Sequence, residues 1–450
     1  MKKKRFSLTS THYILFSFLI AILVGSVLLM LPISSATGEA TPFIDALFTA
    51  TTSTCVTGLV TVPTVSHWSI FGQIIILILI QIGGLGIITI MASIVAFMHK
   101  KMGLADRVLL QDAFNLNTLS GLEEFVRKVI KGTFLIEGLG ALCYMIVFVP
   151  KFGLKGVWIS VFTSVSAFCN AGIDIFAENS LCDYALNPII NFTTAALIIL
   201  GGVGYIVWWD VLRVIRERKK GNLFRRLTLH SKIAISVTGI LLAIGTISVL
   251  FFEYSNPNTI GDFSLLEKIE VSFFQSVTTR TAGFASVPQE NLTDTTALIC
   301  MILMFIGGSP VGTAGGVKTV TLAVLIVAAI ATIRNKKEVN IFGRSLTRET
   351  VSKAAAVVGM SFVIMLSSTI LLSAVTNAGL IDILYETVSA TATVGLTRNL
   401  TGNLNTYGKW IIIATMYLGR VGPISLAVAF NFKKEKSNII KNPVEDISVG

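Results

Sequence analysis

Charged residues are scarce in this sequence, and their scarcity excludes an ordinary soluble protein. Only 14% of the 450 residues are charged, 53% are hydrophobic and the mean hydropathy is +0.77. A soluble domain of this length needs more surface charge, whereas long apolar stretches at this composition are typical of transmembrane helices. The net charge of +11 does not indicate nucleic-acid binding, because the basic residues stand in short clusters between apolar runs.

Motifs for catalysis, metal binding and nucleotide binding are also missing. The five cysteines are an odd number without metal-site spacing, and neither HExxH nor GxSxG occurs. Residues 312–319 almost match a phosphate-binding loop, but Val317 replaces a required glycine and no strand pattern flanks the segment. We therefore expect neither an enzyme nor a chain that binds a nucleotide.

Long apolar runs are what the sequence does have. Eight of them are long enough to cross roughly 30 Å of hydrocarbon as helices. They span residues 12–33, 70–98, 129–150, 187–212, 231–253, 295–333, 354–376 and 406–430. The first run is too long for a signal peptide and lacks a small-residue cleavage site before Pro32, so we expect it to be a membrane span.

The distribution of basic residues predicts the orientation of these spans. Of the 36 Lys and Arg residues, 29 stand in the terminal segments and in alternate connections. These clusters are residues 1–11, 99–131, 213–232, 318–353 and 433–441. Because basic residues are retained on the cytoplasmic side, we expect a multi-pass plasma-membrane protein with both termini in the cytoplasm.

Four shorter segments, each between two paired runs, align on a glycine. They are residues 43–59, 156–173, 267–284 and 380–396, with glycines Gly58, Gly172, Gly283 and Gly395 at intervals of 111 to 114 residues. An aromatic residue stands ten positions before each glycine and a large apolar residue fourteen before, which indicates a short helix with one apolar stripe. These segments are too short to cross the membrane, so we expect them to enter and leave on one side.

This periodicity predicts an all-α integral membrane protein of four tandem helix–pore-loop–helix repeats. Eight transmembrane helices and four re-entrant pore helices would surround a pseudo-fourfold central pore, because non-helical backbone at membrane depth must line a cavity or be buried. The repeats are residues 1–128, 129–230, 231–353 and 354–450, the third with an interrupted second helix. The alternative is that the four glycines only allow close helix packing.

The extended residues that follow each of the four short helices, here called tails, favour selection of a monovalent cation. The carboxyl end of a short helix presents partial negative charge, and an extended tail can aim carbonyl oxygens at an ion that loses its water. Thr393-Val394-Gly395 resembles the T-V-G of potassium-channel filters, whereas the other copies keep only the glycine. The predicted filter residues, here named the glycine segments, are Thr54, Cys55, Val56, Thr57, Gly58, Cys169, Asn170, Ala171, Gly172, Arg280, Thr281, Ala282, Gly283, Ala392, Thr393, Val394 and Gly395. We expect K+ to be bound at Thr54, Val56, Asn170, Thr281 and Thr393.

The second run of each pair carries a glycine cluster, which predicts a gate below the filter. The clusters are residues 82–87, 200–205, 306–317 and 418–423. The third is rich in glycine and contains a proline, so it cannot remain helical. In the fourth, Arg420 replaces a glycine, and a guanidinium within a span indicates function. The predicted gate consists of Gly307, Gly308, Ser309, Pro310, Val311, Gly312, Thr313, Ala314, Gly315 and Gly316, here named the interrupting loop, together with Arg420.

These motifs resemble the Trk/Ktr/HKT superfamily of potassium transporters over nearly the whole chain, and most closely the KtrB-type membrane subunit of bacterial Ktr uptake systems. The resemblance rests on the four glycines, the interrupted third repeat and Arg420. It implies a homodimer, a cytoplasmic ring of KtrA-type subunits that bind ATP or ADP, and uptake that Na+ stimulates in some members. Pro310 in the loop is the one departure from the family pattern.

Several readings stay open at this level. A secondary transporter with broken helices is a rival, although such proteins usually have inverted repeats and intramembrane acids. The acids Asp174, Asp183, Asp262 and Glu290 either concentrate cations at the outer side or are ordinary solvated loop residues. The basic segments 216–226 and 334–348 either dock a partner or only fix the orientation.

The gate is directly testable. Arg420 is either a positive barrier or an anchor for loop carbonyls, and the alternative is an arginine that only stabilises the helix bundle. Replacing Arg420 with Ala, or deleting residues 309–314, is expected to raise the cation flux or to loosen its regulation, because either change removes the obstruction. Unchanged flux in both variants, measured in liposomes, would remove the gate hypothesis.

Overall fold

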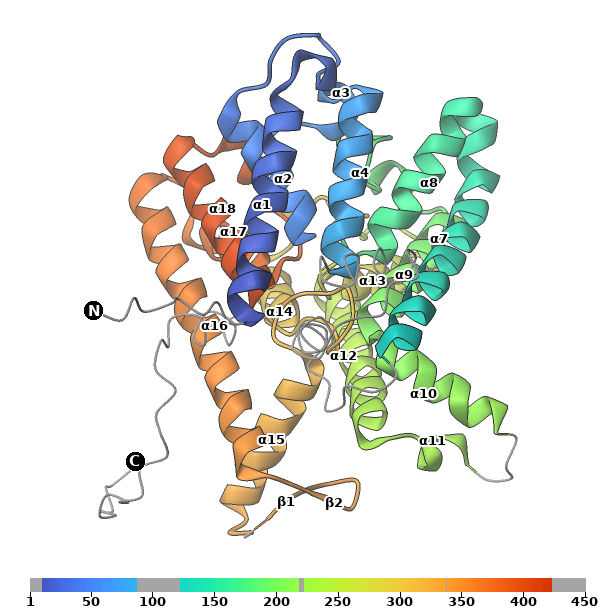
Figure 1. The fold of residues 1–450 in the computed structure, drawn as a ribbon, viewed down its shortest axis with the longest axis vertical. Coiled ribbons are helices and arrows are strands. Elements are labelled where there is room, and N and C mark those ends of the chain that lie inside the picture. Colours follow the sequence, from blue (N-terminus) through green and yellow to red (C-terminus); the bar gives the residue numbers. More distant parts are fainter. Residues whose placement is uncertain (1–9, 87–121, 218–221, 337, 423–450) are drawn as a thin grey trace, which may run out of the picture.

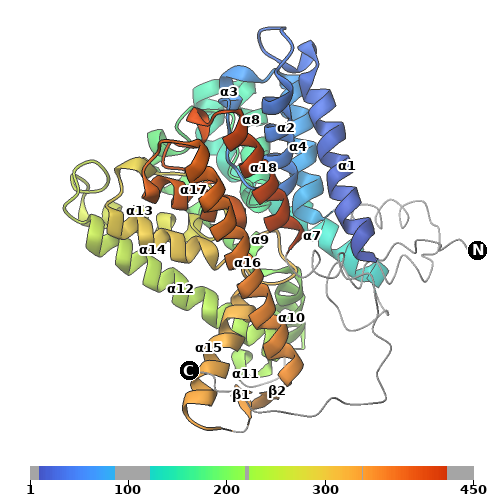
Figure 2. The same ribbon diagram turned by 90° about the vertical axis from the view of Figure 1, so that its left-hand side faces the viewer.

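The computed structural model describes residues 10–86, 122–217, 222–336 and 338–422, which are mostly helical (Figures 1 and 2). The longer helices are α1 (Ser10–Met30), α2 (Phe43–Cys55), α4 (Ile70–Leu85), α7 (Leu122–Phe152), α8 (Leu154–Phe168), α9 (Pro188–Val203), α10 (Tyr205–Arg216), α12 (Leu229–Glu253), α13 (Leu265–Thr278), α14 (Asp294–Phe305), α15 (Thr319–Ile333), α16 (Arg348–Val375), α17 (Leu380–Ala392) and α18 (Thr406–Val421). The shorter ones are α3 (Thr64–His67) and α11 (Leu223–Arg226). Strands β1 (Val339–Ile341) and β2 (Arg344–Leu346) form an antiparallel hairpin that the sequence did not predict.

Four long helices confirm four of the predicted spans. Helices α1, α7, α12 and α16 are long and apolar enough to cross a membrane, and they begin shortly before or at the predicted spans. Their outward faces are apolar: Ile146 is 63% exposed, Ile247 67% and Phe251 74%. Side chains of this kind belong against hydrocarbon, so the protein is a multi-pass membrane protein.

The other four predicted spans begin as shorter helices. Among the described residues, four helices can span a membrane, or five if α9 and α10 count as one broken span. Since the predicted spans 70–98 and 406–430 continue outside the described residues, eight transmembrane helices stays a prediction. The predicted span 187–212 bends by 94° between α9 and α10. In three of the four clusters the last glycine ends the helix: Gly86, Gly204 and Gly422 have φ of 83°, 95° and 87°. Residues 87–98 and 423–430, and the basic clusters at both termini, lie outside the described residues.

Each of the second helices begins in the same way. A side-chain oxygen of the N-cap residue accepts a hydrogen bond from a backbone N–H in the first turn. The caps are Ser69 for α4, Asn187 for α9, Thr293 for α14 and Asn405 for α18. The same kind of N-cap hydrogen bond therefore marks where the chain re-enters the bundle after each glycine segment.

The helices are packed in a closed order. Each short helix lies against the long helix before it, in the pairs α1 with α2, α7 with α8, α12 with α13 and α16 with α17. Each second helix lies against the short helix of the next unit: α4 against α8, α9 against α13, and α14 against α17. Helix α18 then packs against α2, which brings the last described helix beside one of the first (Figure 2).

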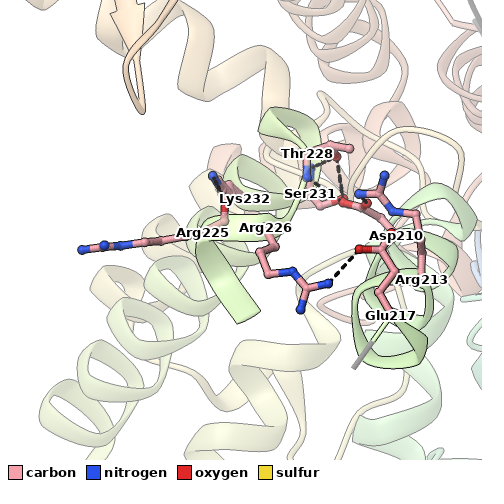
Figure 3. A network of polar contacts seen from close by, with 8 residues as sticks. All are labelled: Asp210, Arg213, Glu217, Arg225, Arg226, Thr228, Ser231 and Lys232. Carbon is pink, nitrogen blue, oxygen red and sulfur yellow. Dashed lines mark hydrogen bonds and ion pairs between the residues drawn. The ribbon is translucent and has the colours of Figure 1, made fainter. Parts of the chain in front are cut away.

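A polar network stabilises the turn from α10 to α12, at the end of the molecule that carries β1 and β2 (Figures 1 and 3). Asp210 accepts hydrogen bonds from the backbone N–H and the hydroxyl of Thr228, both at 2.8 Å, and pairs with Arg213 at 2.6 Å. Thr228 caps α12. Figure 3 shows Arg225 extending away from this network, and Phe224 beside it contacts Phe342 of the hairpin with ring centroids 5.8 Å apart.

Candidate functional site

The four predicted glycines meet at one place in the bundle. Each lies against the carbonyl oxygen of the residue that precedes the next glycine. A Cβ added to Gly58 would lie 2.6 Å from the oxygen of Ala171, one on Gly172 would lie 2.5 Å from that of Ala282, and one on Gly283 would lie 2.6 Å from that of Val394. A Cβ on Gly395 would clash with the oxygen of Thr57, which closes the ring. No side chain larger than hydrogen fits at these positions.

The backbone of the four segments repeats an unusual conformation. Two residues before each glycine, a non-glycine residue has a positive φ: 55° at Val56, 60° at Asn170, 66° at Thr281 and 51° at Thr393. The glycines themselves have φ of 105°, 63°, 83° and 98° in chain order. Left-handed conformations at non-glycine residues are costly and cluster at functional sites. Four copies at one sequence position indicate a backbone held in a defined shape.

Hydroxyl groups from the short helices hold that shape. Gly58 donates its N–H to Thr52 Oγ1 at 2.9 Å, and Gly395 donates to Ser389 Oγ at 3.0 Å. Ile173, after the second glycine, donates to Ser166 Oγ at 3.0 Å. In the third copy the direction is reversed: Thr278 donates its hydroxyl to the carbonyl of Phe284 at 2.6 Å. The sequence carried this signal, because a hydroxyl residue stands six positions before three of the glycines.

The polarity of the site suits a cation. The carboxyl ends of α2, α8, α13 and α17 all lead directly into the glycine segments, so their partial negative charges gather there. Within the described structure, the hydroxyls of Thr54, Thr57 and Thr393 are buried and have no hydrogen-bond partner. Oxygen atoms without a donor of their own can act as ligands for a dehydrated monovalent cation.

A cavity of about 470 Å³ opens on one side of the four glycines. Its lining includes all four of them and the acids Asp174, Glu178 and Glu290. Asp183 and Asp262, which the sequence also suggested, do not line it. Burial raises the pKa of Asp174 to about 7, although a hydrogen bond from Ser180 opposes the shift.

The interrupting loop contacts residues that precede the glycines, whereas the cavity is lined by the glycines and residues that follow them. The N–H groups of Ser309 and Thr313 donate to the carbonyls of Gly202 and Gly201, at 2.8 and 3.1 Å. The Thr313 hydroxyl lies 3.1 Å from the side-chain oxygen of Asn170. Gly315 donates its N–H to Thr281 Oγ1 at 3.2 Å. The loop is therefore in direct contact with two glycine segments.

Two arginines hold the loop in place. Arg420 donates to the carbonyl of Thr313 at 2.7 Å and also to that of Gly83. Arg280 donates to the carbonyl of Gly307 at 3.0 Å, so its side chain points to the loop. Among the described residues Arg420 has no carboxylate in an ion pair, and it binds carbonyl oxygens instead; its role in a gate stays a prediction.

The second-helix glycines have a packing role that the sequence left open. Gly83, Gly201 and Gly419 lie against the carbonyl oxygens of Thr54, Phe168 and Thr391, each four residues before one of the four aligned glycines. A Cβ at any of them would clash with that oxygen. In the third unit Gly307 instead contacts the carbonyl of Gly315, because the loop folds back on itself.

The structure brings the backbones of the four glycine segments together, but not all of their side chains. Cys169 Sγ lies 3.7 Å from Gln81 Oε1 and 3.9 Å from Glu137 Oε1, away from the ring of glycines. Residues that the sequence analysis missed include the supporting hydroxyls of Thr52, Ser166 and Ser389. Their signal was present, but threonine and serine within a short helix are too common to single out.

Comparison with known proteins identifies similar chains. The TrkH family model, described as "Cation transport protein", matches residues 7–442. The potassium/sodium uptake protein NtpJ of Enterococcus hirae is 39% identical over 100% of this chain and 99% of its own length. The Ktr system potassium uptake protein B of Bacillus subtilis is also 39% identical, over 98% of this chain and 97% of its own. The crystal structure of the potassium transporter TrkH from Vibrio parahaemolyticus has a TM-score of 0.73, at 15% identity, over 95% of this chain and 86% of that one.

A glycine substitution tests whether the meeting point is functional. We expect Gly58→Ala to abolish cation uptake in proteoliposomes or to reduce it at least about tenfold, because the Cβ would press on the Ala171 oxygen at a positive φ. The matched control is Gly138→Ala in α7, where a Cβ meets no atom within 4 Å. Equal uptake by the Gly58→Ala and Gly138→Ala proteins would contradict a functional role of the ring.

Proposed function

The chain belongs to the TrkH family of cation transport proteins, and on this basis we propose that it takes up potassium across the plasma membrane. Membership of a transport family confirms the expectation that the chain is not an enzyme. The observation that carries the proposal is the ring of four glycines, each against a carbonyl of its neighbour. Potassium is named because two full-length relatives at 39% identity are potassium uptake proteins.

In this proposal the glycine segments are the selectivity filter of a pseudo-fourfold pore. Carbonyl oxygens of the four segments replace the water of a K+ ion, and the hydroxyls of Thr54, Thr281 and Thr393 add ligands. The carbonyls of Val56 and Asn170 complete the proposed set. Because the four segments differ in sequence, the sites along the pore are not equivalent. The positive φ of the residue two positions before each glycine supports one common backbone conformation for the four segments.

We propose that the interrupting loop is a gate that is closed in this structure. The loop contacts residues that precede the glycines, where an ion from the cavity would have to leave the filter. Its hydrogen bonds to the Gly201 and Gly202 carbonyls and to Arg420 hold it there. Opening needs these bonds to break, together with those from Gly315 to Thr281 and from Arg280 to Gly307, and a glycine-rich chain has many other accessible conformations. Arg420 also adds a positive charge that opposes passage of a cation.

Regulation is proposed by analogy with the relatives. The Bacillus subtilis relative is named as part of a Ktr system, which supports a membrane subunit that works with regulatory subunits. A cytoplasmic KtrA-type ring that binds ATP or ADP, and a homodimer of this chain, remain the proposed assembly. The Enterococcus hirae relative is named for both potassium and sodium, which supports a role of Na+ in transport or its stimulation.

Ion flux tests the proposed function. Expression is expected to restore growth at low external K+ to a bacterium that lacks its own uptake systems. The purified protein in liposomes is expected to pass K+ and Rb+ at least about tenfold faster than Na+, because a carbonyl filter discriminates by the replaced hydration shell. Liposomes with the Gly58→Ala protein are the control. Equal K+ and Na+ fluxes, or flux of a small solute instead, would contradict the proposal.

The outer cavity generates a separate prediction. Asp174 lines it, and desolvation raises the pKa of this carboxyl to about 7, so it is charged above that pH and neutral below it. A negative charge in the cavity raises the local cation concentration. The external K+ concentration for half-maximal uptake should therefore rise, by about threefold, as the pH falls from about 8 to about 6.

The Asp174→Asn variant is expected to lose this pH dependence and to keep the weaker K+ affinity at every pH. Asp262→Asn, which removes an acid that does not line the cavity, is the control and should behave as the unmodified protein. Uptake is measured with a K+ tracer over a series of external concentrations. If Asp174→Asn retains the full pH dependence, the assignment of the cation-concentrating charge to Asp174 is wrong.

A further inference from the structure

A buried acid in the fourth short helix has no part in the filter and gate as described so far. Glu386 stands nine residues before Gly395 in α17, and its side chain is fully buried. The equivalent positions in the other units are Thr49, Thr163 and Phe274, which carry no charge. Burying a carboxyl group costs free energy unless hydrogen bonds compensate it, so the burial of Glu386 requires an explanation.

Both carboxylate oxygens of Glu386 bind the chain just beyond the fourth glycine. Thr397 donates its hydroxyl to Oε2 at 2.6 Å, and Thr401 donates its hydroxyl to Oε1. Thr397 is two residues after Gly395 and lines the outer cavity. Its Oγ1 also accepts the N–H of Leu400 at 3.2 Å, so residues 397–401 form one compact turn on the carboxylate.

Glu386 is the middle member of a series along one face of α17. Asp382, one turn before it, pairs with Arg398 at 2.7 Å. Ser389, nearly one turn after it, accepts the N–H of Gly395 at 3.0 Å. Residues at spacings of three and four share a helix face, so three consecutive side chains hold three consecutive parts of the fourth segment. Glu386 fixes the part between the glycine and the arginine.

This arrangement is absent from the equivalent positions of the first two units. In the described structure the hydroxyls of Thr49 and Thr163 are buried and have no hydrogen-bond partner, so neither holds the chain that follows its glycine. At this position of the short helix the fourth segment is held by a group that the first two lack, whereas in the first unit Asp45, the equivalent of Asp382, accepts a hydrogen bond from Thr61 at 2.8 Å. Its glycine contacts two of its neighbours, because Gly395 Cα lies close to where the Cβ of Gly58 and of Gly283 would stand, at 3.2 Å in both cases.

We propose that Glu386 is a positioning residue that sets the discrimination between K+ and Na+ by holding the outer end of the fourth filter segment. The inference rests on the proposed function. Discrimination depends on the number and spacing of oxygen ligands, and a segment that can relax adapts to the smaller ion as readily as to the larger one. Loss of Glu386 frees Thr397 and, through it, the backbone on either side of Gly395.

The test is the ratio of K+ to Na+ flux in liposomes. Glu386→Ala is expected to lower this ratio by about tenfold, the factor that corresponds to the loss of one charge-assisted hydrogen bond. Thr397→Val should lower it in the same direction, because it removes the donor while the carboxyl group remains. The K+ flux itself should fall less than the ratio, since the carbonyl ligands stay in place.

A double variant and a matched control distinguish positioning from general destabilisation. If Glu386 acts through Thr397, the two changes should not add. The double variant Glu386→Ala/Thr397→Val should then have a ratio of K+ to Na+ flux at least as high as that of the less selective single variant. Thr163→Val, which changes the equivalent position of the second unit, is the control and should keep the ratio of the unmodified protein. Thr397→Val conserves volume and keeps the proposal testable if Glu386→Ala does not fold.

The outcomes separate this inference from the proposed function. An unmodified protein that does not prefer K+ overturns the proposed function. An unmodified protein that prefers K+, with Glu386→Ala and Thr397→Val equally selective, overturns only the role of Glu386. A loss of selectivity in Thr163→Val as large as in Glu386→Ala also overturns it, because the effect would then follow from any change behind a filter segment.

Discussion

The close approach of four backbone segments is the constraint on which the rest of this structure depends. Each of the four glycines touches a carbonyl oxygen of the neighbouring segment, and no side chain has room there. The same segments share a residue with positive φ two positions before the glycine, and hydroxyl groups of the short helices bind the chain beside it. The close approach also explains the glycines of the second helices. The short helices can converge only because Gly83, Gly201 and Gly419 have no side chain that would clash with their carbonyl groups.

Much of the architecture followed from sequence because it repeats. The four long spans, the short helices and the interruption after Phe305 were predicted from apolar runs, a shared glycine and a segment unfit for helix. The bend after Val203 was not, since LGGVGY is apolar throughout and only the left-handed φ of Gly204 breaks it. Hydropathy reports how well a segment fits lipid, but it does not report where one residue changes the chain direction.

The site was less predictable, because its decisive contacts join residues far apart in the chain. The sequence placed Arg420 in the gate from its position alone, yet nothing in it indicated that Thr313 and Gly83 would be the acceptors. The role of Glu386 was hidden for the same reason: an acid in a short apolar helix has meaning only when its partners are known. The repeat period and the composition predict how the helices are arranged. The hydrogen-bond acceptors of each polar group are known only from the folded structure.

The contact between α18 and α2 has a consequence for how the protein is made. The ribosome delivers the units in the order in which they follow one another around the centre, so this seam is the last to form. Until α18 is in place, the first and fourth units present polar backbone groups on either side of the open seam, which lipid cannot satisfy. We therefore expect a nascent chain to be most vulnerable to membrane proteases before α18 has joined the bundle.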